Sequence, residues 1–319
     1  MLSLGRYARL FRAPDFGYLL GTSLLARVPE GMLSLAITLL VTRNGSYARA
    51  GAVVAVYVTG AAVAGPALGR LVDRLGRAVI LLPASVAEAA SLVGMALMPA
   101  AWTAGVVACA LAAGLCTPPV VAAARSLWPT VLPGEQVTTA YGLEATLQEL
   151  IYIVGPSLVA LAVSLAGPAV ALVVVAALLT AGVVTFSLHP RVRRRSSPPA
   201  PDRSVRSWRP PLSLAPLLCA LVLTGAFSFV ELSTVRFARS QGAPAAAGVA
   251  LAVWSAGSLL GGLVLGTRLT VIRDARWRLV TLMFAVGVLM LLPATAPSVW
   301  VLAALLFVAG IAIAPTVAA

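Results

Sequence analysis

Ten long apolar runs, separated by short polar breaks, cover most of the chain. Each holds roughly 20 mostly apolar residues, which is the length that a helix needs to cross the hydrocarbon core of a bilayer. The runs are continuously apolar rather than alternating, which predicts helices and not the strands of a membrane barrel. The sequence therefore predicts an all-α polytopic membrane protein with spans at residues 16–41, 50–68, 78–99, 102–124, 141–165, 168–188, 212–235, 245–266, 279–296 and 298–319.

The composition agrees with this pattern and excludes several classes of protein. Of the 319 residues, 60% are hydrophobic and 10% are charged, whereas a soluble domain is about 25% charged. A water-soluble enzyme, a disordered chain and a disulfide-stabilised scaffold are therefore excluded. The chain has one histidine, His189, and three cysteines, which all lie within apolar runs. Because a catalytic or metal-binding set needs several converging side chains, we expect no enzymatic activity, no cofactor and no bound metal.

All 23 basic residues are arginines, and their positions orient the predicted spans. Eighteen lie before the first run or in the breaks after the second, fourth, sixth and eighth runs. Four lie in the breaks after the first and seventh runs, and Arg27 lies within the first run. Breaks rich in arginine stay on the cytoplasmic side of a membrane. We therefore expect a multi-pass protein of the cytoplasmic membrane with its N-terminus in the cytoplasm. The distribution also argues against nucleic acid as a partner, because the net charge of +13 is spread over separate loops.

One break is long enough to be a linker. Residues 189–211 hold seven arginines, several prolines and four serines, and they show no helix or strand pattern. This composition predicts a flexible cytoplasmic connection. It divides the chain into an N-terminal bundle of six spans, residues 1–188, and a C-terminal bundle of four spans, residues 212–319.

The two bundles contain an internal repeat. Residues 51–69 match residues 248–266 at seven positions with an offset of 197, and residues 114–123 match residues 310–319 at five positions with an offset of 196. Both members of each pair have the same predicted orientation, as in transporters built from two parallel repeats. Close helix packing is predicted where two small residues stand four apart, at Gly65–Gly69, Gly257–Gly261 and Gly262–Gly266.

A nine-residue motif follows the second run. Its sequence, Gly69-Arg70-Leu71-Val72-Asp73-Arg74-Leu75-Gly76-Arg77, resembles the G-x-L-x-D-R-x-G-R signature of the major facilitator superfamily, in its usual place on the first cytoplasmic loop of a half. Residues 24–32 also resemble actinobacterial members of that family. Glycines permit a tight turn, and an acid at a helix end can accept hydrogen bonds from arginines or from helix N-termini.

The resemblance covers the whole chain and implies both a fold and a function. The fold would be a bundle of the major facilitator type, with a six-helix N-terminal half and four helices of a C-terminal half. The function would be secondary active transport of a small molecule by alternating access. Since the family has twelve helices, a fragment, a truncated non-transporting remnant and a ten-span variant all remain open. In the family the motif loop holds the outward-facing state, a role carried here to Gly69, Asp73, Arg74, Gly76 and Arg77.

Ionisable side chains within the spans are candidates for the transport site, since each costs at least about 2.5 kcal/mol to place in a bilayer. Arg27 and Glu30 share one face of the first span and either pair with each other or line the cavity. One of Glu30 or Glu149 is expected to carry a coupling proton. Spans 1, 5 and 7 line the cavity in facilitator-type folds, and the cavity candidates on them are Arg27, Glu30, Glu149, Tyr152 and Glu231.

The direction of transport is inferred from the fifth span. Gly155-Pro156 matches part of the G-xxx-G-P-xx-G-G pattern of drug–proton antiporters and predicts a kink, but Ile151, Val159 and Ala160 replace the other glycines. The lack of a polar lining of the sugar or peptide type favours proton-coupled efflux over uptake by a uniporter or symporter. We expect a monomer whose partners are the lipid bilayer, a small-molecule substrate and protons. Glu88 ranks lower as a candidate, because its span is peripheral in that fold.

Overall fold

The computed structural model describes residues 9–43, 46–99, 102–194, 214–243, 246–265 and 275–317. Within these ranges the regular secondary structure is helical, and no strand occurs in them. The chain divides into two compact units, Met1–Ser196 and Ser197–Ala319, and each is described by itself. Helices occupy all ten predicted runs, so the all-α membrane architecture expected from the sequence is confirmed.

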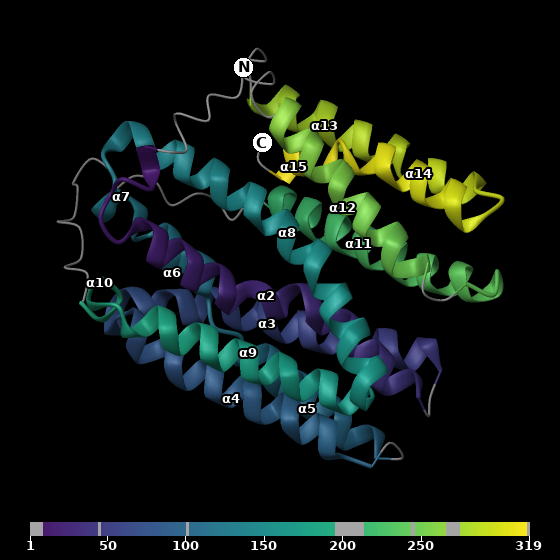
Figure 1. Cartoon of the computed structure of the whole chain (residues 1–319), viewed down its shortest axis with the longest axis horizontal. Helices are drawn as coiled ribbons and strands as arrows, with labels where there is room; N and C mark the ends of the chain where they lie inside the picture. Colours follow the sequence, from purple (N-terminus) through teal and green to yellow (C-terminus); the bar gives the residue numbers. More distant parts are fainter. Residues whose placement is uncertain are drawn as a thin grey trace. The chain divides into compact units, whose positions relative to one another are not determined.

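The first unit is a bundle of apolar helices that run back and forth beside one another (Figure 1). Six of its helical stretches are long and apolar enough to cross a membrane. Helix α9 lies against α2 and α4, α3 lies against α5, and α8 lies against α2. The helices of this unit are α2 (Phe16–Thr42), α3 (Tyr47–Leu75), α4 (Arg77–Leu97), α5 (Thr103–Leu115), α6 (Val120–Arg125), α7 (Trp128–Val131), α8 (Gly134–Ala166), α9 (Pro168–Leu188) and α10 (Pro190–Arg193).

Local sequence explains where several of these helices begin and end. Helix α3 starts after Ser46, whose hydroxyl accepts a hydrogen bond from the backbone N–H of Arg49 at 3.2 Å, which is the usual role of an N-cap serine. Gly76, at φ 104°, separates α3 from α4, and Gly167, at φ 88°, separates α8 from α9. Only glycine adopts such φ values without strain, so these two glycines fix the sharp reversals between consecutive helices.

The structure corrects three boundaries that the sequence predicted. Helix α3 continues to Leu75, so residues 69–75 of the nine-residue motif are helical rather than part of a loop. The predicted run 102–124 is broken at residues 116–119 between α5 and α6, because Pro118 and Pro119 have no backbone N–H to continue the helix. The predicted linker 189–211 begins with the short helix α10, where no helix was expected.

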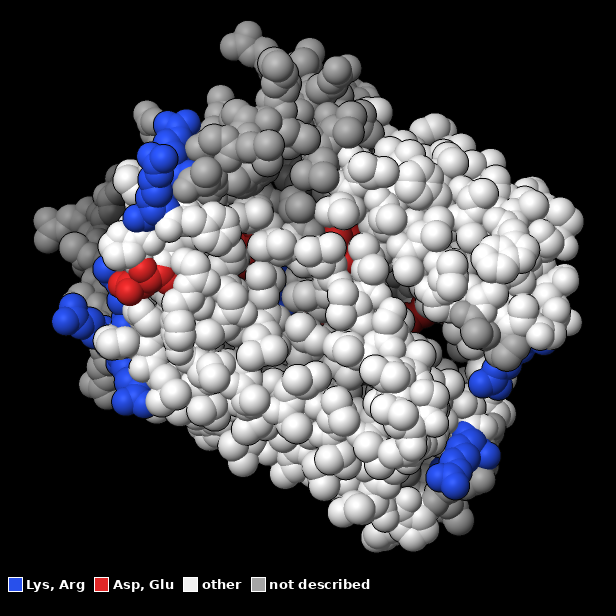
Figure 2. Space-filling view, viewed as in Figure 1, with Lys and Arg blue, Asp and Glu red and all other residues white. Residues whose placement is uncertain are grey.

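The core of the first unit consists of two apolar clusters. One surrounds Trp128, Phe16 and Phe186, with the rings of Phe16 and Trp128 centred 5.2 Å apart. The other is built around Met32 and Leu172. Much of the outer surface is also apolar: on the face seen in Figure 2, the basic side chains (blue) lie near the left and right margins, and the acidic side chains (red) between them are seen only in small hollows. This distribution suits a body surrounded by lipid.

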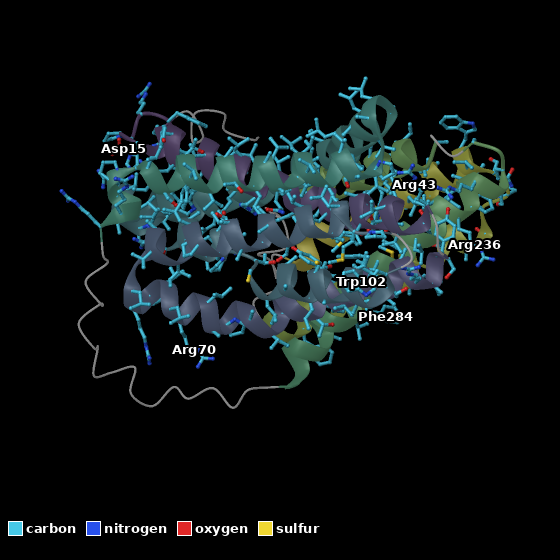
Figure 3. The ribbon with its side chains drawn as sticks, turned by 90° about the horizontal axis from the view of Figure 1, so that it is seen from below. Asp15, Arg43, Arg70, Trp102, Arg236 and Phe284 are labelled. Atoms are coloured by element: carbon cyan, nitrogen blue, oxygen red, sulfur yellow. The ribbon has the colours of Figure 1, made fainter. Side chains whose placement is uncertain are left out.

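Polar side chains mark the two ends of the first unit. Asp15 and Arg70 lie toward one end of its helices, and Arg43 and Trp102 lie toward the other (Figure 3). The end that holds Asp15 and Arg70 is the one expected to face the cytoplasm.

The second unit repeats part of this arrangement. Its helices α12 and α14 lie against each other, and a small core forms around Val230, Ala250 and Leu306. Three of its apolar helical stretches are shorter than the spans of the first unit. The helices are α11 (Leu214–Ser240), α12 (Ala246–Leu265), α13 (Ala275–Leu289), the 3-10 helix η3 (Leu292–Thr295), α14 (Val299–Gly310) and α15 (Ile313–Val317).

A pair of glycines brings two backbones together in each unit. In the first unit, a Cβ on Gly114 would collide with the Tyr57 carbonyl of α3, and a Cβ on Gly60 would meet the Leu111 carbonyl of α5 at 3.0 Å. We call this contact the glycine crossing. It is a place where only glycine lets the helix backbones approach this closely.

The second unit contains the matching glycine crossing. A Cβ on Gly310 would collide with the Trp254 carbonyl, and a Cβ on Gly257 would collide with the Phe307 carbonyl. Trp254 and Phe307 are the positions that the two sequence offsets pair with Tyr57 and Leu111. The internal repeat read from the sequence is therefore a repeat of helix contacts.

The predicted small-residue pairs have different outcomes. Gly257 and Gly261 both face the backbone of the segment from Phe307 to Ile311, so close packing at this pair is confirmed. Gly262 faces the methyl group of Ala314, while its partner Gly266 lies outside the described residues. Among the described residues of the first unit, no atom of another helix lies within 4 Å of a Cβ placed on Gly65 or Gly69, so close packing at this pair is not found within that unit.

Candidate functional site

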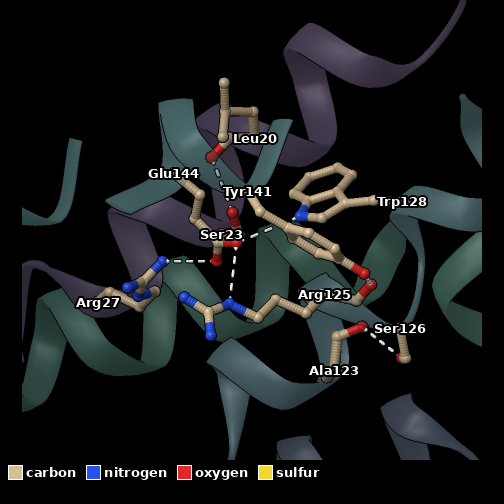
Figure 4. Close-up of polar contacts among 9 residues, drawn as sticks. All are labelled: Leu20, Ser23, Arg27, Ala123, Arg125, Ser126, Trp128, Tyr141 and Glu144. Atoms are coloured by element: carbon tan, nitrogen blue, oxygen red, sulfur yellow. Dashed lines mark hydrogen bonds and ion pairs between the residues drawn. The ribbon is translucent and has the colours of Figure 1, made fainter. Parts of the chain in front are cut away.

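A buried carboxylate links side chains from four helices of the first unit. Glu144 of α8 has an exposed fraction of 0%. Its Oε1 accepts a hydrogen bond from Arg27 Nη1 of α2 at 2.9 Å. Its Oε2 accepts hydrogen bonds from Arg125 Nε, at the end of α6, and from Trp128 Nε1, at the start of α7, both at 3.3 Å. These four residues are the Glu144 cluster, drawn in Figure 4.

The Glu144 cluster compensates a charge that the apolar interior would otherwise exclude. A buried carboxylate is tolerated when cations and hydrogen bonds satisfy its oxygens. The Arg27 side chain is 3% exposed, whereas that of Arg125 is 49% exposed. Tyr141 holds the end of α6 in place by donating a hydrogen bond from its hydroxyl to the Arg125 carbonyl at 3.3 Å. Arg27 is therefore the buried partner of the carboxylate, and Arg125 is its partner at the surface.

A second polar contact lies one turn further along the same two helices. Gln148 Nε2 of α8 donates a hydrogen bond to Glu30 Oε2 of α2 at 3.2 Å. Within the described part of the chain, Arg27 Nε and Gln148 Oε1 are both buried and have no hydrogen-bond partner. We call Arg27, Glu30, Glu144 and Gln148 the α2–α8 seam. It presents one unused donor and one unused acceptor, the pair of groups that a polar ligand can satisfy.

The structure brings some of the predicted cavity residues together. Arg27 and Glu30 both lie on the seam, but among the described ion pairs Arg27 binds Glu144 rather than Glu30. The reason is that α2 and α8 pack directly against each other, which places the Glu144 carboxylate opposite the guanidinium. Sequence reasoning missed Glu144 as a site residue. The available signal was its spacing of four residues from Gln148, which places both on one helix face.

The other three predicted cavity residues are not among the four residues that define the seam. Glu149 of α8 is half-buried. Tyr152, also on α8, is 45% exposed, and its hydroxyl interacts with Gln148. Glu231 lies on α11 of the second unit and is half-buried there. Tyr152 extends the polar surface of α8 beyond Gln148.

Gly155 lies where α8 crosses α2. A Cβ on Gly155 would come within 2.5 Å of the Gly31 carbonyl carbon, so the two backbones are in direct contact. Pro156 follows inside the same helix. The Gly-Pro pair, which the sequence predicts as a kink, is thus a close-packing point that fixes the distance between the two helices of the seam.

The nine-residue motif forms the junction of α3 and α4. Asp73 and Arg74 are exposed on the last turn of α3, and Gly76 makes the turn. Gly69 is helical and makes no turn, contrary to the role expected for both glycines. Arg77 is 7% exposed, and its Nε donates a hydrogen bond to the Ser126 hydroxyl at 3.0 Å. The motif is therefore anchored to the end of α6 through Arg77.

Asp15 holds together the end of the first unit that the sequence predicts to face the cytoplasm. Its Oδ2 accepts a hydrogen bond from Arg191 Nε at 2.9 Å, and its Oδ1 lies 3.5 Å from His189 Nε2. Arg191 also donates a hydrogen bond to the Thr130 carbonyl at 3.2 Å. The hydrogen bond from Arg191, and then the proximity of His189, lower the pKa of Asp15, while partial burial opposes this shift. We call this set the Asp15 clasp.

Chemistry at the site is limited to polar and ionic contacts. Among the residues that the structure describes, no three histidine, cysteine or acidic side chains are grouped as a metal ion would require. The seam offers one buried donor, one buried acceptor and an ion pair as its polar groups.

Comparisons with known proteins agree with this picture. The family model of the Major Facilitator Superfamily matches residues 19–319. No curated protein matches the sequence. A bacterial homologue of the human lysosomal transporter Spinster, in an inward-facing and occupied conformation, has a TM-score of 0.55 and 22% identity over 94% of this chain and 72% of its own. A bacterial homologue of the iron transporter ferroportin, in an outward-facing state, has a TM-score of 0.59 and 15% identity over 95% of this chain and 81% of its own.

Proposed function

Because the chain belongs to the Major Facilitator Superfamily, it is a membrane transport protein rather than an enzyme, and we propose that it exports a small molecule by alternating access, coupled to protons. The observation that carries the proposal is the α2–α8 seam, with its buried and unpaired Arg27 Nε and Gln148 Oε1. A transport site needs such groups to replace the water that the substrate loses on binding.

The proposed coupling proton binds a carboxylate within the membrane. Glu30 lies on the seam beside Gln148, and Glu149 lies on the next position of α8. Proton transfer at Glu30 changes the charge of the seam by one unit beside the Arg27 guanidinium, and proton transfer at Glu149 changes the charge next to Gln148 by one unit. Such a change alters the affinity of the seam for a polar substrate, which is what coupled transport requires.

The remaining features of the proposal concern the whole protein. It acts as a monomer in the cytoplasmic membrane, with its N-terminus in the cytoplasm, and residues 189–211 connect bundles at 1–188 and 212–319. Gly69, Asp73, Arg74, Gly76 and Arg77 stabilise the outward-facing state. The exposed Asp73 and the anchored Arg77 support this role.

Everted membrane vesicles test the direction and the coupling. An inside-acid pH gradient is expected to drive accumulation of one member of a substrate panel, and a protonophore is expected to abolish it. Glu30→Gln or Glu149→Gln should abolish the gradient-driven component. Ser164→Ala is the matched control on α8, since its exposed hydroxyl bonds only its own helix at the Leu161 carbonyl. Full gradient-driven transport by both glutamine variants would exclude these carboxylates, and transport that is insensitive to the protonophore would identify a uniporter.

A further inference from the structure

A second buried carboxylate lies on helices that the α2–α8 seam does not use. Glu88 of α4 is 1% exposed. Its Oε1 accepts hydrogen bonds from the Tyr57 hydroxyl of α3 at 3.0 Å and from the Thr117 hydroxyl at 3.2 Å, and the two hydroxyl oxygens lie 3.2 Å apart. Thr117 stands in the break between α5 and α6. We call these three residues the Glu88 cluster.

The hydrogen bonds of the Glu88 cluster leave half of the carboxylate unsatisfied. Glu88 Oε2 is buried and has no hydrogen-bond partner in the described part of the chain. No arginine or histidine forms an ion pair with Glu88 among the described residues, in contrast to Glu144. The other titratable groups nearby are Glu30, which adds negative charge, and the Cys116 thiol. A buried carboxylate in such surroundings needs a positive charge.

The break between α5 and α6 places Thr117 beside the carboxylate. Pro118 and Pro119 have no N–H to continue α5, and the helix ends with its Ala112, Ala113 and Gly114 carbonyls accepting hydrogen bonds from the N–H groups of Cys116 and Thr117. Small hard cations prefer carboxylate and hydroxyl oxygens among the side chains of proteins. The carboxylate of Glu88 and the two hydroxyls of the cluster are oxygen ligands of this kind.

The second unit shows that helix packing does not require this polar cluster. The glycine crossing of α3 and α5 recurs in α12 and α14 with the same backbone contacts. At the matching positions, Trp254 replaces Tyr57 and Ile313 replaces Thr117. Since the crossing forms with apolar residues there, the polar residues of the first unit serve something other than packing.

We propose that Glu88, Tyr57 and Thr117 form a binding site for a small monovalent cation, either Na⁺ or a proton. The cation neutralises the carboxylate and occupies the position faced by Glu88 Oε2. This cation site is separate from the transport site proposed at the α2–α8 seam. Cation binding to it can be measured without a transport substrate. Failure of transport in vesicles and failure of cation binding are therefore separate results.

Protection of Cys116 from alkylation tests the Na⁺ alternative. The whole chain, with Cys109→Ala and Cys219→Ala, is purified in detergent and labelled with a maleimide in NaCl or in choline chloride of equal ionic strength. Na⁺ is expected to slow labelling of Cys116 in a saturable way, and Glu88→Gln is expected to remove the effect. For the proton alternative, infrared difference spectra between two pH values should contain a protonated-carboxyl band that is missing in Glu88→Gln.

Conservative variants keep the test valid if Glu88→Gln does not fold. Thr117→Val and Tyr57→Phe each remove one hydroxyl and retain the carboxylate. Loss of one hydrogen bond to a charged group should raise the half-saturating Na⁺ concentration about tenfold, or shift the pH midpoint of the carboxyl band. Thr180→Val and Tyr18→Phe are matched controls, since their hydroxyls bond the Ala176 and Thr185 carbonyls elsewhere in the unit. The proposal is overturned if neither Na⁺ nor pH separates the cluster variants from wild type.

Discussion

The Glu144 cluster gives the sharpest prediction for stability. Replacing Glu144 with glutamine leaves the guanidinium of Arg27 buried without a counter-charge, because that side chain is 3% exposed. Removing one partner of a buried ion pair typically costs about 3–5 kcal/mol. Arg125 is 49% exposed, and an exposed pair is worth about 0.2–1 kcal/mol. Glu144→Gln is therefore expected to lower the free energy of unfolding several times more than Arg125→Gln.

A double variant separates the charge from its packing. Arg27→Met combined with Glu144→Met removes both buried charges and retains most of the side-chain volume. Because replacing a buried pair with apolar residues is often neutral or stabilising, the double variant is expected to lose less stability than Glu144→Gln alone. Trp128, whose indole N–H bonds Glu144, keeps its apolar surroundings in this variant.

Equilibrium unfolding in mixed detergent micelles measures these differences. Each variant is titrated with denaturing detergent while tryptophan fluorescence reports the folded fraction, and retained helix content at the start confirms folding. The reasoning is refuted if Glu144→Gln lies within about 1 kcal/mol of wild type. It is equally refuted if the double variant loses as much stability as the single variants Arg27→Met and Glu144→Met lose together.

Two more predictions follow from other contacts. Because the hydrogen bond from Arg191 lowers the pKa of Asp15, the Asp15 clasp should stabilise the protein above about pH 4, the unfolded value, and lose this effect as the pH falls through the folded value. A pH series of unfolding midpoints should show this acid-dependent loss in wild type and not in Asp15→Asn; equal pH profiles would contradict it. Gly114→Ala should reduce the yield of folded monomer in size-exclusion chromatography, because its Cβ would collide with the Tyr57 carbonyl. Gly65→Ala should behave as wild type, since no described atom of another helix lies within 4 Å of its Cβ. Equal yields of the two alanine variants would show that the glycine crossing tolerates a side chain.

The positions of the spans follow from the sequence because hydropathy is a property of consecutive residues. The ten apolar runs, the glycine repeat and the motif at Gly69–Arg77 are all local patterns, and each coincides with helices in the structure. The break at Pro118-Pro119 was also visible in the sequence. Hydropathy alone does not reveal this break, because the residues on both sides of it are apolar.

The contents of the site do not follow from the sequence in the same way. Arg27 pairs with Glu144 because α2 and α8 are neighbours, and this adjacency is set by Gly31 and Gly155 meeting backbone to backbone. Depth in the bilayer alone could not distinguish Glu144 from Glu149, which lies a turn further along the same helix. Likewise, the low rank of Glu88 rests on the position of its span alone, whereas its partners Tyr57 and Thr117 come from α3 and from the break between α5 and α6.

The two glycine crossings also bear on which positions of the internal repeat remain readable in the sequence. Every glycine codon begins with two guanines, and any change at either of them replaces the glycine or ends the chain. At Gly60, Gly114, Gly257 and Gly310, such a change would place a side chain against a neighbouring backbone. Residues around them are free to diverge, as Thr117 and Ile313 have. The glycines of the crossings are therefore positions of the repeat at which a substitution is expected to be poorly tolerated.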